Sequence, residues 1–86
     1  MDKVIFEKDA LSQMMYWIHN DIKMVDKIYS LIKDIDRNGP AKGIGKPERL
    51  KHQPGWSRHI NQGHSLIYAI KNDLIHIISC KGHYED

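Results

Sequence analysis

The side chains best suited to exchange protons with a substrate are concentrated in the second half of the chain. Five of the six histidines lie there, at positions 52, 59, 64, 76 and 83. The only glutamate between residues 8 and 84 is Glu48, which stands among the cations Lys46, Arg49 and Lys51. From the residues alone, the simpler explanations are a surface carboxylate paired with lysines and a histidine without a partner near the chain end. Residue types alone therefore leave a catalytic role for Glu48 and His83 open.

Charge is distributed unevenly along the chain. Residues 1–41 carry a net charge of −1, residues 42–84 carry +5, and the last two residues return −2. A basic region of this kind attracts polyanions such as RNA. A solvated basic surface without a partner accounts for the same charge, and the two interpretations stand level at this point.

Arg58 is the most conspicuous single charge. It falls within an alternating stretch, on the same parity as Trp56 and Ile60, where a cation is expected only if it faces a partner or a groove. Its planar guanidinium matches the geometry of a phosphate. The alternative is an edge arginine that extends its charged end to solvent.

Several classes of protein are excluded. Histidines 52, 59 and 64 match no reliable metal-ligand spacing, so we expect no metal site. A single cysteine, Cys80, rules out a disulfide framework. A chain of 86 residues predicts one domain, over residues 1–86, without a deep cofactor cavity. The longest stretch without charged side chains, residues 10–20, is too short to cross a bilayer, and we expect a cytoplasmic protein with no membrane partner.

The first half of the chain predicts a strand and two helices. Val4-Ile5-Phe6 is a short apolar run, and apolar residues then recur at helical spacing from Leu11 to Ile18 and from Ile22 to Ile35. Asp21 is a candidate cap between the two helices, and Asn38-Gly39-Pro40 ends the second one. We therefore expect an antiparallel helical hairpin after the first strand.

The second half predicts strands joined by turns. The candidate strands are 49–52, 56–61, 64–71 and 74–80, with turns at Pro54-Gly55, Gln62-Gly63 and Asn72-Asp73. The last three strands form an antiparallel meander. The fold class is therefore α+β, with two layers in which the N-terminal strand and the helical hairpin pack on an antiparallel sheet.

Several short strings, at this order and spacing, resemble the YoeB/Txe toxins of bacterial toxin–antitoxin pairs, within the RelE/ParE superfamily. The resemblance covers nearly the whole chain and implies a RelE-like, microbial-ribonuclease-like fold. The matching strings are Tyr16-Trp17, Leu31-Ile32-Lys33-Asp34-Ile35, Gly43-Ile44-Gly45-Lys46-Pro47-Glu48, Leu50-Lys51-His52, Gly55-Trp56-Ser57-Arg58, Ile60-Asn61, His64, Leu66-Ile67-Tyr68-Ala69, Cys80 and His83-Tyr84.

The resemblance implies a function and a set of partners. Members of this family are ribosome-dependent mRNA endonucleases that cut the codon in the ribosomal A site. The implied partners are a YefM-like antitoxin, a bacterial 70S ribosome and its mRNA, a second copy of the toxin, and operator DNA reached only through the antitoxin complex. No cofactor is implied.

The same resemblance assigns roles to individual residues. Metal-independent RNA scission needs a base for the 2′-hydroxyl, an acid for the 5′-oxygen and positive charge at the phosphate. It produces a 2′,3′-cyclic phosphate and a 5′-hydroxyl. The catalytic roles fall on Glu48 as base, His83 as acid, Tyr84 for substrate positioning and Arg58 for the phosphate. The expected RNA-binding residues are Lys46, Arg49, Lys51 and His59.

The chain departs from the family pattern at three places. Ser65 stands where relatives usually carry an arginine that contacts the phosphate, a loss worth roughly 2–4 kcal/mol in the transition state. Lys81-Gly82 replaces an arginine and an aromatic residue, and Gly82 is expected to weaken the positioning of His83. Glu85 and Asp86 follow Tyr84, on which relatives often end.

Two alternatives of other classes stay open. One is a toxin of the same fold that binds a protein target such as a gyrase and cuts nothing. The other is a weakened relative that mainly binds antitoxin and helps to repress its own operon. Glu48 and the His83-Tyr84 pair favour the nuclease, whereas Ser65 keeps the weakened relative open.

Overall fold

Two helices follow a short first strand, as the apolar spacing predicts. The computed structural model describes residues 3–83 and places β1 at Val4–Phe6, α1 at Lys8–Asn20 and α2 at Ile22–Asn38. The side chains that α2 buries recur every three or four residues, which is the spacing of one helix face. They are Met24, Ile28, Leu31 and Ile35.

The ends of the helices agree in part with the prediction. Gly39, with a φ of +84°, follows the last residue of α2, as expected of a residue that ends a helix. Asp21 occupies the N-cap position of α2, but its side chain makes no capping hydrogen bond. The predicted cap position is therefore confirmed, but the carboxylate does not bond the helix; the Asp21 backbone N–H donates to the Trp17 carbonyl at 2.8 Å.

The strands form one mixed sheet in the order β1-β5-β4-β3-β2. After α2 come β2 at Glu48–Arg49, β3 at Trp56–His59, β4 at Ser65–Lys71 and β5 at Leu74–Ser79. The expected meander is present, because β3, β4 and β5 pair antiparallel in succession. Two details differ from expectation. The strand expected at 49–52 is only two residues long, and β1 joins the far edge in parallel with β5.

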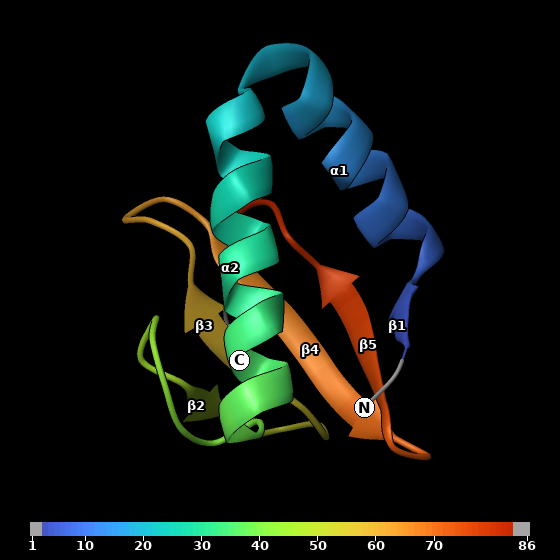
Figure 1. Cartoon of the computed structure of the whole chain (residues 1–86), viewed down its shortest axis with the longest axis vertical. Coiled ribbons are helices and arrows are strands. Elements are labelled where there is room, and N and C mark those ends of the chain that lie inside the picture. The colour runs from blue at the N-terminus through green and yellow to red at the C-terminus, as the bar shows by residue number, and fades with distance from the viewer. Residues whose placement is uncertain (1–2, 84–86) are drawn as a thin grey trace.

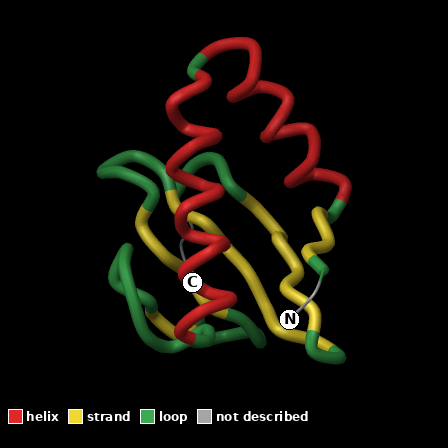
Figure 2. The backbone as a smooth tube through the Cα atoms, viewed as in Figure 1, coloured by secondary structure: helices red, strands yellow, loops and turns green. Residues whose placement is uncertain are grey.

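Both helices pack on the same face of this sheet, as Figures 1 and 2 show. The core lies between the layers and is built from α1, α2 and the alternate residues of the strands that point toward them. This arrangement confirms the predicted two-layer α+β fold. Within residues 3–83, neither helix has the length and apolar character needed to span a bilayer.

The β4–β5 turn is made by Asn72 and Asp73, which both have positive φ, at +53° and +60°. Lys71 pairs with Leu74, so this is a two-residue hairpin loop of the type that favours glycine at its second position. We predict that Asp73→Gly raises the free energy of unfolding by up to about 1 kcal/mol, because glycine adopts this conformation without strain.

Urea denaturation of the parent and the Asp73→Gly variant measures this change. Gly63, which lies in an exposed turn without a positive φ, provides a control site where Gly63→Ala leaves the unfolding midpoint nearly unchanged. A lower midpoint for Asp73→Gly would contradict the prediction.

Candidate functional site

The register of the sheet places Glu48 and His59 on the face away from the helices. Glu48 of β2 pairs with Ser57 of β3, so their side chains share one face. His59, two residues further along β3, points to that same face. Glu48 and His59 are both exposed. Arg58 lies between Ser57 and His59 and therefore points the other way, toward the helices.

The start of the C-terminal segment runs alongside β4. The Ser65 N–H donates to the Gly82 carbonyl at 3.0 Å, and the Gly82 N–H donates to Nδ1 of His64 at 2.8 Å. Ser65 itself pairs with His59 across β3 and β4. His83 is exposed and follows directly after this anchored glycine. Gly82 is thus held at both its amide and its carbonyl, which corrects the expectation that it loosens the segment before His83.

Glu48 and His83 are brought to the same region but not into contact. Both lie in the described part of the chain, and no hydrogen bond or ion pair joins them. β3 and β4 stand between β2 and the anchored segment, which is about three strand spacings, or roughly 14 Å. Tyr84, for which substrate positioning was predicted, lies outside the described residues, as do Glu85 and Asp86.

The predicted RNA-binding side chains are exposed around this region. Lys46 and His59 border a hollow of about 390 Å³ together with Gly45, Asn61 and Gln62. The His59 N–H donates to the Gly45 carbonyl at 2.7 Å, which ties the loop before β2 to the end of β3. Arg49 lies over the Trp56 ring, with its guanidinium carbon 5.7 Å from the ring centroid. Lys51 follows on the segment after β2.

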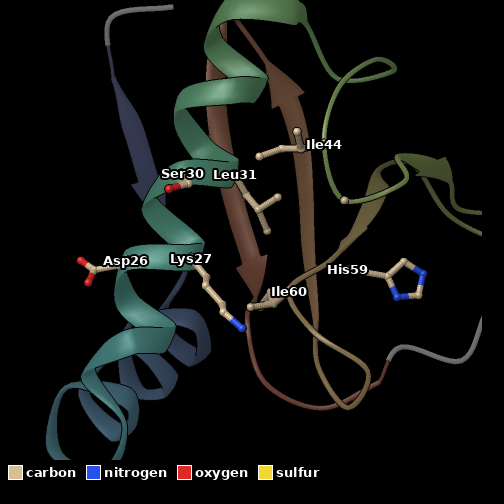
Figure 3. Close-up of a pocket in the computed structure, with 8 residues that line it drawn as sticks. Asp26, Lys27, Ser30, Leu31, Ile44, His59 and Ile60 are labelled. Carbon is tan, nitrogen blue, oxygen red and sulfur yellow. The ribbon is translucent and has the colours of Figure 1, made fainter.

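A second hollow, of about 460 Å³, lies between α2 and the same loop. Figure 3 shows Lys27 extending from α2 toward Ile60, and the His59 ring directed away from the helix. His59 therefore stands between two open hollows rather than in an enclosed cavity. The residues that line the hollow of about 460 Å³ are Asp26, Lys27, Ser30, Leu31, Ile44, Gly45, His59 and Ile60.

Arg58 has a structural role rather than the predicted one. Its side chain is 0% exposed, and a guanidinium has five N–H donors. All five donate within the protein. The acceptors are the Tyr68 hydroxyl at 2.9 Å, Asp34 Oδ2 at 2.5 Å, and the carbonyls of Ile44 at 3.0 Å, Gly39 at 3.0 Å and Lys42 at 2.7 Å.

The prediction that Arg58 stabilises the scissile phosphate is therefore wrong for this structure. A phosphate has no path to a fully buried guanidinium, and no donor is left for it. The alternation of the strand correctly predicts the direction of the side chain, because Arg58 faces the interior together with Trp56 and Ile60. There it donates hydrogen bonds to the loop at 39–45 of the same chain.

The Arg58 contacts hold the loop at 39–45 that leads to Glu48. Tyr68 donates its hydroxyl to the Pro40 carbonyl at 2.6 Å, and the Ile44 N–H donates to Asp34 Oδ2 at 3.1 Å. The chain passes so close to Asp34 that a Cβ at Gly43 would lie 1.7 Å from Oδ2. Only glycine fits at position 43, where φ is +125°.

The charges in this cluster perturb one another. The hydrogen bond from Arg58 holds the pKa of Asp34 below its ordinary value of 3.8, although desolvation acts in the opposite direction. Burial raises the pKa of Tyr68, so the phenol stays protonated and donates. Elsewhere, burial raises the pKa of Cys80 to about 11, so its thiol is protonated at neutral pH and does not act as a nucleophile.

No group of three histidine, cysteine, aspartate or glutamate side chains within residues 3–83 is arranged to hold a metal ion. The residues that converge on this region are instead one exposed carboxylate, exposed imidazoles and exposed cations. Such groups can bind a polyanion and transfer protons to and from it.

Comparison with known proteins identifies the family. The sequence model of the "YoeB-like toxin of bacterial type II toxin-antitoxin system" matches residues 6–84. The chain belongs to the YoeB toxin family. Toxin YoeB of Escherichia coli strain K12 is 42% identical over 84 residues, which is 95% of this chain and 99% of that protein.

Solved structures of YoeB proteins agree with the family assignment. The toxin chain in a heterotetrameric YoeB–YefM complex from Staphylococcus aureus has a TM-score of 0.89 and 46% identity, covering 95% of this chain and 97% of that one. A YoeB dimer from the same organism has a TM-score of 0.90, 46% identity and the same coverage. The predicted resemblance and the RelE-like fold are both confirmed.

Sequence reasoning missed three residues that shape the region. Asp34 and Tyr68 complete the Arg58 cluster, and His64 anchors Gly82. All three lie in strings that carry the YoeB resemblance, which is a signal that they matter. Their partners are the Arg58 side chain and backbone groups distant in sequence, so no local pattern could assign their roles.

We predict that Arg58→Met lowers the free energy of unfolding by at least about 2 kcal/mol, because it leaves several loop carbonyls and the half-buried Asp34 carboxylate without their donors. Urea denaturation measures the loss. Arg49→Met, which removes an exposed arginine from the neighbouring strand, is the matched control and changes stability by less than about 0.5 kcal/mol. Equal, small effects in both variants would contradict the role given to Arg58.

The lowered pKa of Asp34 predicts a pH-dependent contribution to stability. The folded-state pKa is depressed, so the contribution is present above the unfolded value of 3.8 and is lost as pH falls through the folded value. Asp34→Asn should be less stable than the parent at pH 7, and the gap between their urea midpoints should narrow from about pH 5 toward pH 2. A gap that does not change with pH would show that the carboxylate charge contributes nothing.

Proposed function

We propose that this YoeB-family toxin is a ribosome-dependent mRNA endoribonuclease that cuts within the A-site codon and so inhibits translation. The observation that supports this most directly is the placement of Glu48 and the His83 segment at one end of the sheet, bordered by exposed cations. Among the described residues, the hollows beside His59 are open to solvent, as an extended RNA strand requires.

The proposed reaction needs only the side chains of the chain and the substrate. Glu48 takes the proton of the 2′-hydroxyl, whose oxygen attacks the adjacent phosphorus. The bond to the 5′-oxygen breaks, and His83 gives that oxygen its proton. The products are a 2′,3′-cyclic phosphate and a 5′-hydroxyl end, and each positioned acid or base contributes about 10²–10⁴ in rate.

The distance between the two groups sets a requirement on the substrate. The phosphodiester must lie over β3, between Glu48 and the anchored segment, with Tyr84 positioning the RNA beside His83. A ribosome that holds the mRNA bent in its A site supplies the orientation that the free protein lacks. This explains why the toxin would act on the ribosome rather than on free RNA.

Positive charge at the phosphate must come from residues other than Arg58. Lys46 and His59, which share a hollow, are the closest candidates, and Arg49 and Lys51 add longer-range attraction to RNA. Ser65, opposite His59, contributes no charge. We therefore propose that His59 partly replaces the cation that Ser65 does not supply.

We also propose the partners that this function requires. They are a YefM-like antitoxin, by analogy with the Staphylococcus aureus YoeB–YefM complex, and a second toxin copy, by analogy with the YoeB dimer. Operator DNA is reached only through the antitoxin complex. The toxin acts in the cytoplasm, where ribosomes and mRNA are found.

Mapping mRNA ends in a purified 70S translation assay tests the proposal. The parent should produce fragments with 5′-hydroxyl ends within the A-site codon. Glu48→Gln and His83→Gln should each lower the cleavage rate by about 10²–10⁴ at unchanged ribosome binding.

Glu7→Gln and His19→Gln are matched controls, because they remove the same chemical groups from exposed positions at the two ends of α1. Both should cleave at the parental rate. Arrested translation with intact mRNA would replace the nuclease by a ribosome-blocking protein. No effect on translation would favour a toxin that binds another protein target.

A further inference from the structure

The segment before His83 is fixed by an unusual contact between a side chain and the backbone. The Gly82 N–H donates to Nδ1 of His64 at 2.8 Å, across 18 residues of sequence. Gly82 has a φ of +85°, so its amide and carbonyl both turn toward the start of β4. The second bond, from the Ser65 N–H to the Gly82 carbonyl, uses backbone alone. His64 thus supplies the only side chain that holds Gly82 among the described residues.

The imidazole of His64 is itself held in place. Its ring meets the Trp17 ring edge to face, with centroids 4.8 Å apart and planes at 85°. Trp17 also donates its indole N–H to the Cys80 carbonyl at 2.9 Å, and Gln13 accepts the Cys80 N–H at 2.6 Å. The end of β5 and the imidazole are therefore both fastened to α1, and Gly82 lies between them.

The hydrogen bond depends on the protonation state of His64. Nδ1 accepts a hydrogen bond only in the neutral imidazole that carries its hydrogen on Nε2, whereas an imidazolium donates from both nitrogens. The elements that contact His64 carry further ionisable groups. They are Lys8, Asp9, Tyr16 and His19 on α1, His59 on β3, and Cys80, Lys81 and His83 on the C-terminal segment. Within residues 3–83, no hydrogen bond or ion pair joins the His64 side chain to any of these side chains.

We propose that His64 is a positioning residue for His83: in its neutral form it accepts the Gly82 amide and so fixes the point from which His83 reaches the substrate. The inference rests on the proposed function for the role of His83, but the anchor itself does not. A shift of about 1 Å in a catalytic group lowers rates substantially, so an acid on a segment outside the sheet needs such an anchor.

Hydrogen exchange of the Gly82 amide, followed by NMR, tests the anchor directly. His64→Asn keeps a side-chain acceptor close to the position of Nδ1 and cannot titrate, whereas His64→Leu removes the acceptor. We expect Gly82 protection to fall at least tenfold in His64→Leu and to persist in His64→Asn. His19→Leu, on the exposed end of α1, is the control and leaves Gly82 unchanged. Equal protection in the parent and His64→Leu would overturn the proposal.

A pH series keeps the test valid if His64→Leu fails to fold. In the parent, the protection factor of Gly82 should fall when acidification protonates the imidazole, while the buried Ile77 amide keeps its protection. In His64→Asn the Gly82 protection factor should not change over this range. A parental Gly82 protection factor that is independent of pH would overturn the role of the neutral imidazole.

The cleavage assay then tests the link to His83. His64→Leu should lower kcat about 10–100-fold with little change in KM, and His64→Asn should recover most of that loss. Normal cleavage by His64→Leu, with Gly82 released, would overturn the positioning role. If the parent cuts no mRNA while the exchange results hold, the proposed function has failed and the anchor stands.

Discussion

A guanidinium without any exposed surface imposes the strongest constraint in this molecule. Arg58 carries a permanent charge, and burying it is tolerable only if every N–H finds an acceptor. The fold meets this demand with a carboxylate from α2, a phenol from β4 and three carbonyls from the loop at 39–45. That loop has no secondary structure of its own, so its shape is set by the cation it surrounds. Glu48 follows three residues later and inherits its position from this cluster.

The other half of the candidate site is positioned by a different helix. Trp17 and Gln13 on α1 bind the backbone of Cys80, and His64 and Ser65 hold Gly82 just beyond it. The loop before Glu48 depends instead on Asp34 of α2. The relative placement of the proposed base and acid therefore follows from how the two helices of the hairpin pack on the sheet.

The helices and the antiparallel meander could be predicted from the sequence because their signals are local. Apolar spacing located both helices, and turn residues such as Asn72-Asp73 located the meander. The parallel pairing of β1 with β5 was missed because nothing in Val4-Ile5-Phe6 specifies a partner about seventy residues away. Arg58 shows the corresponding limit for the site. Its inward direction was predictable from the alternation of the strand. The carbonyls of Gly39, Lys42 and Ile44 that accept its hydrogen bonds were not predictable, because a backbone carbonyl is present in every residue type.

The parallel pairing of β1 with β5 has a consequence for the order in which the chain assembles. Of the strands within residues 3–83, β1 is synthesised first, yet the strand with which it pairs, β5, is synthesised last. Val4 and Ile5, which stay 40% and 38% exposed even in the folded sheet, have no strand partner until the segment from α1 to β5 has been translated. Closing so long a loop is slow, and it is achieved only after β5 has left the translating ribosome. The sheet is thus completed only after β5 has been synthesised, so the edge formed by β1 is the last part of the described sheet to pair.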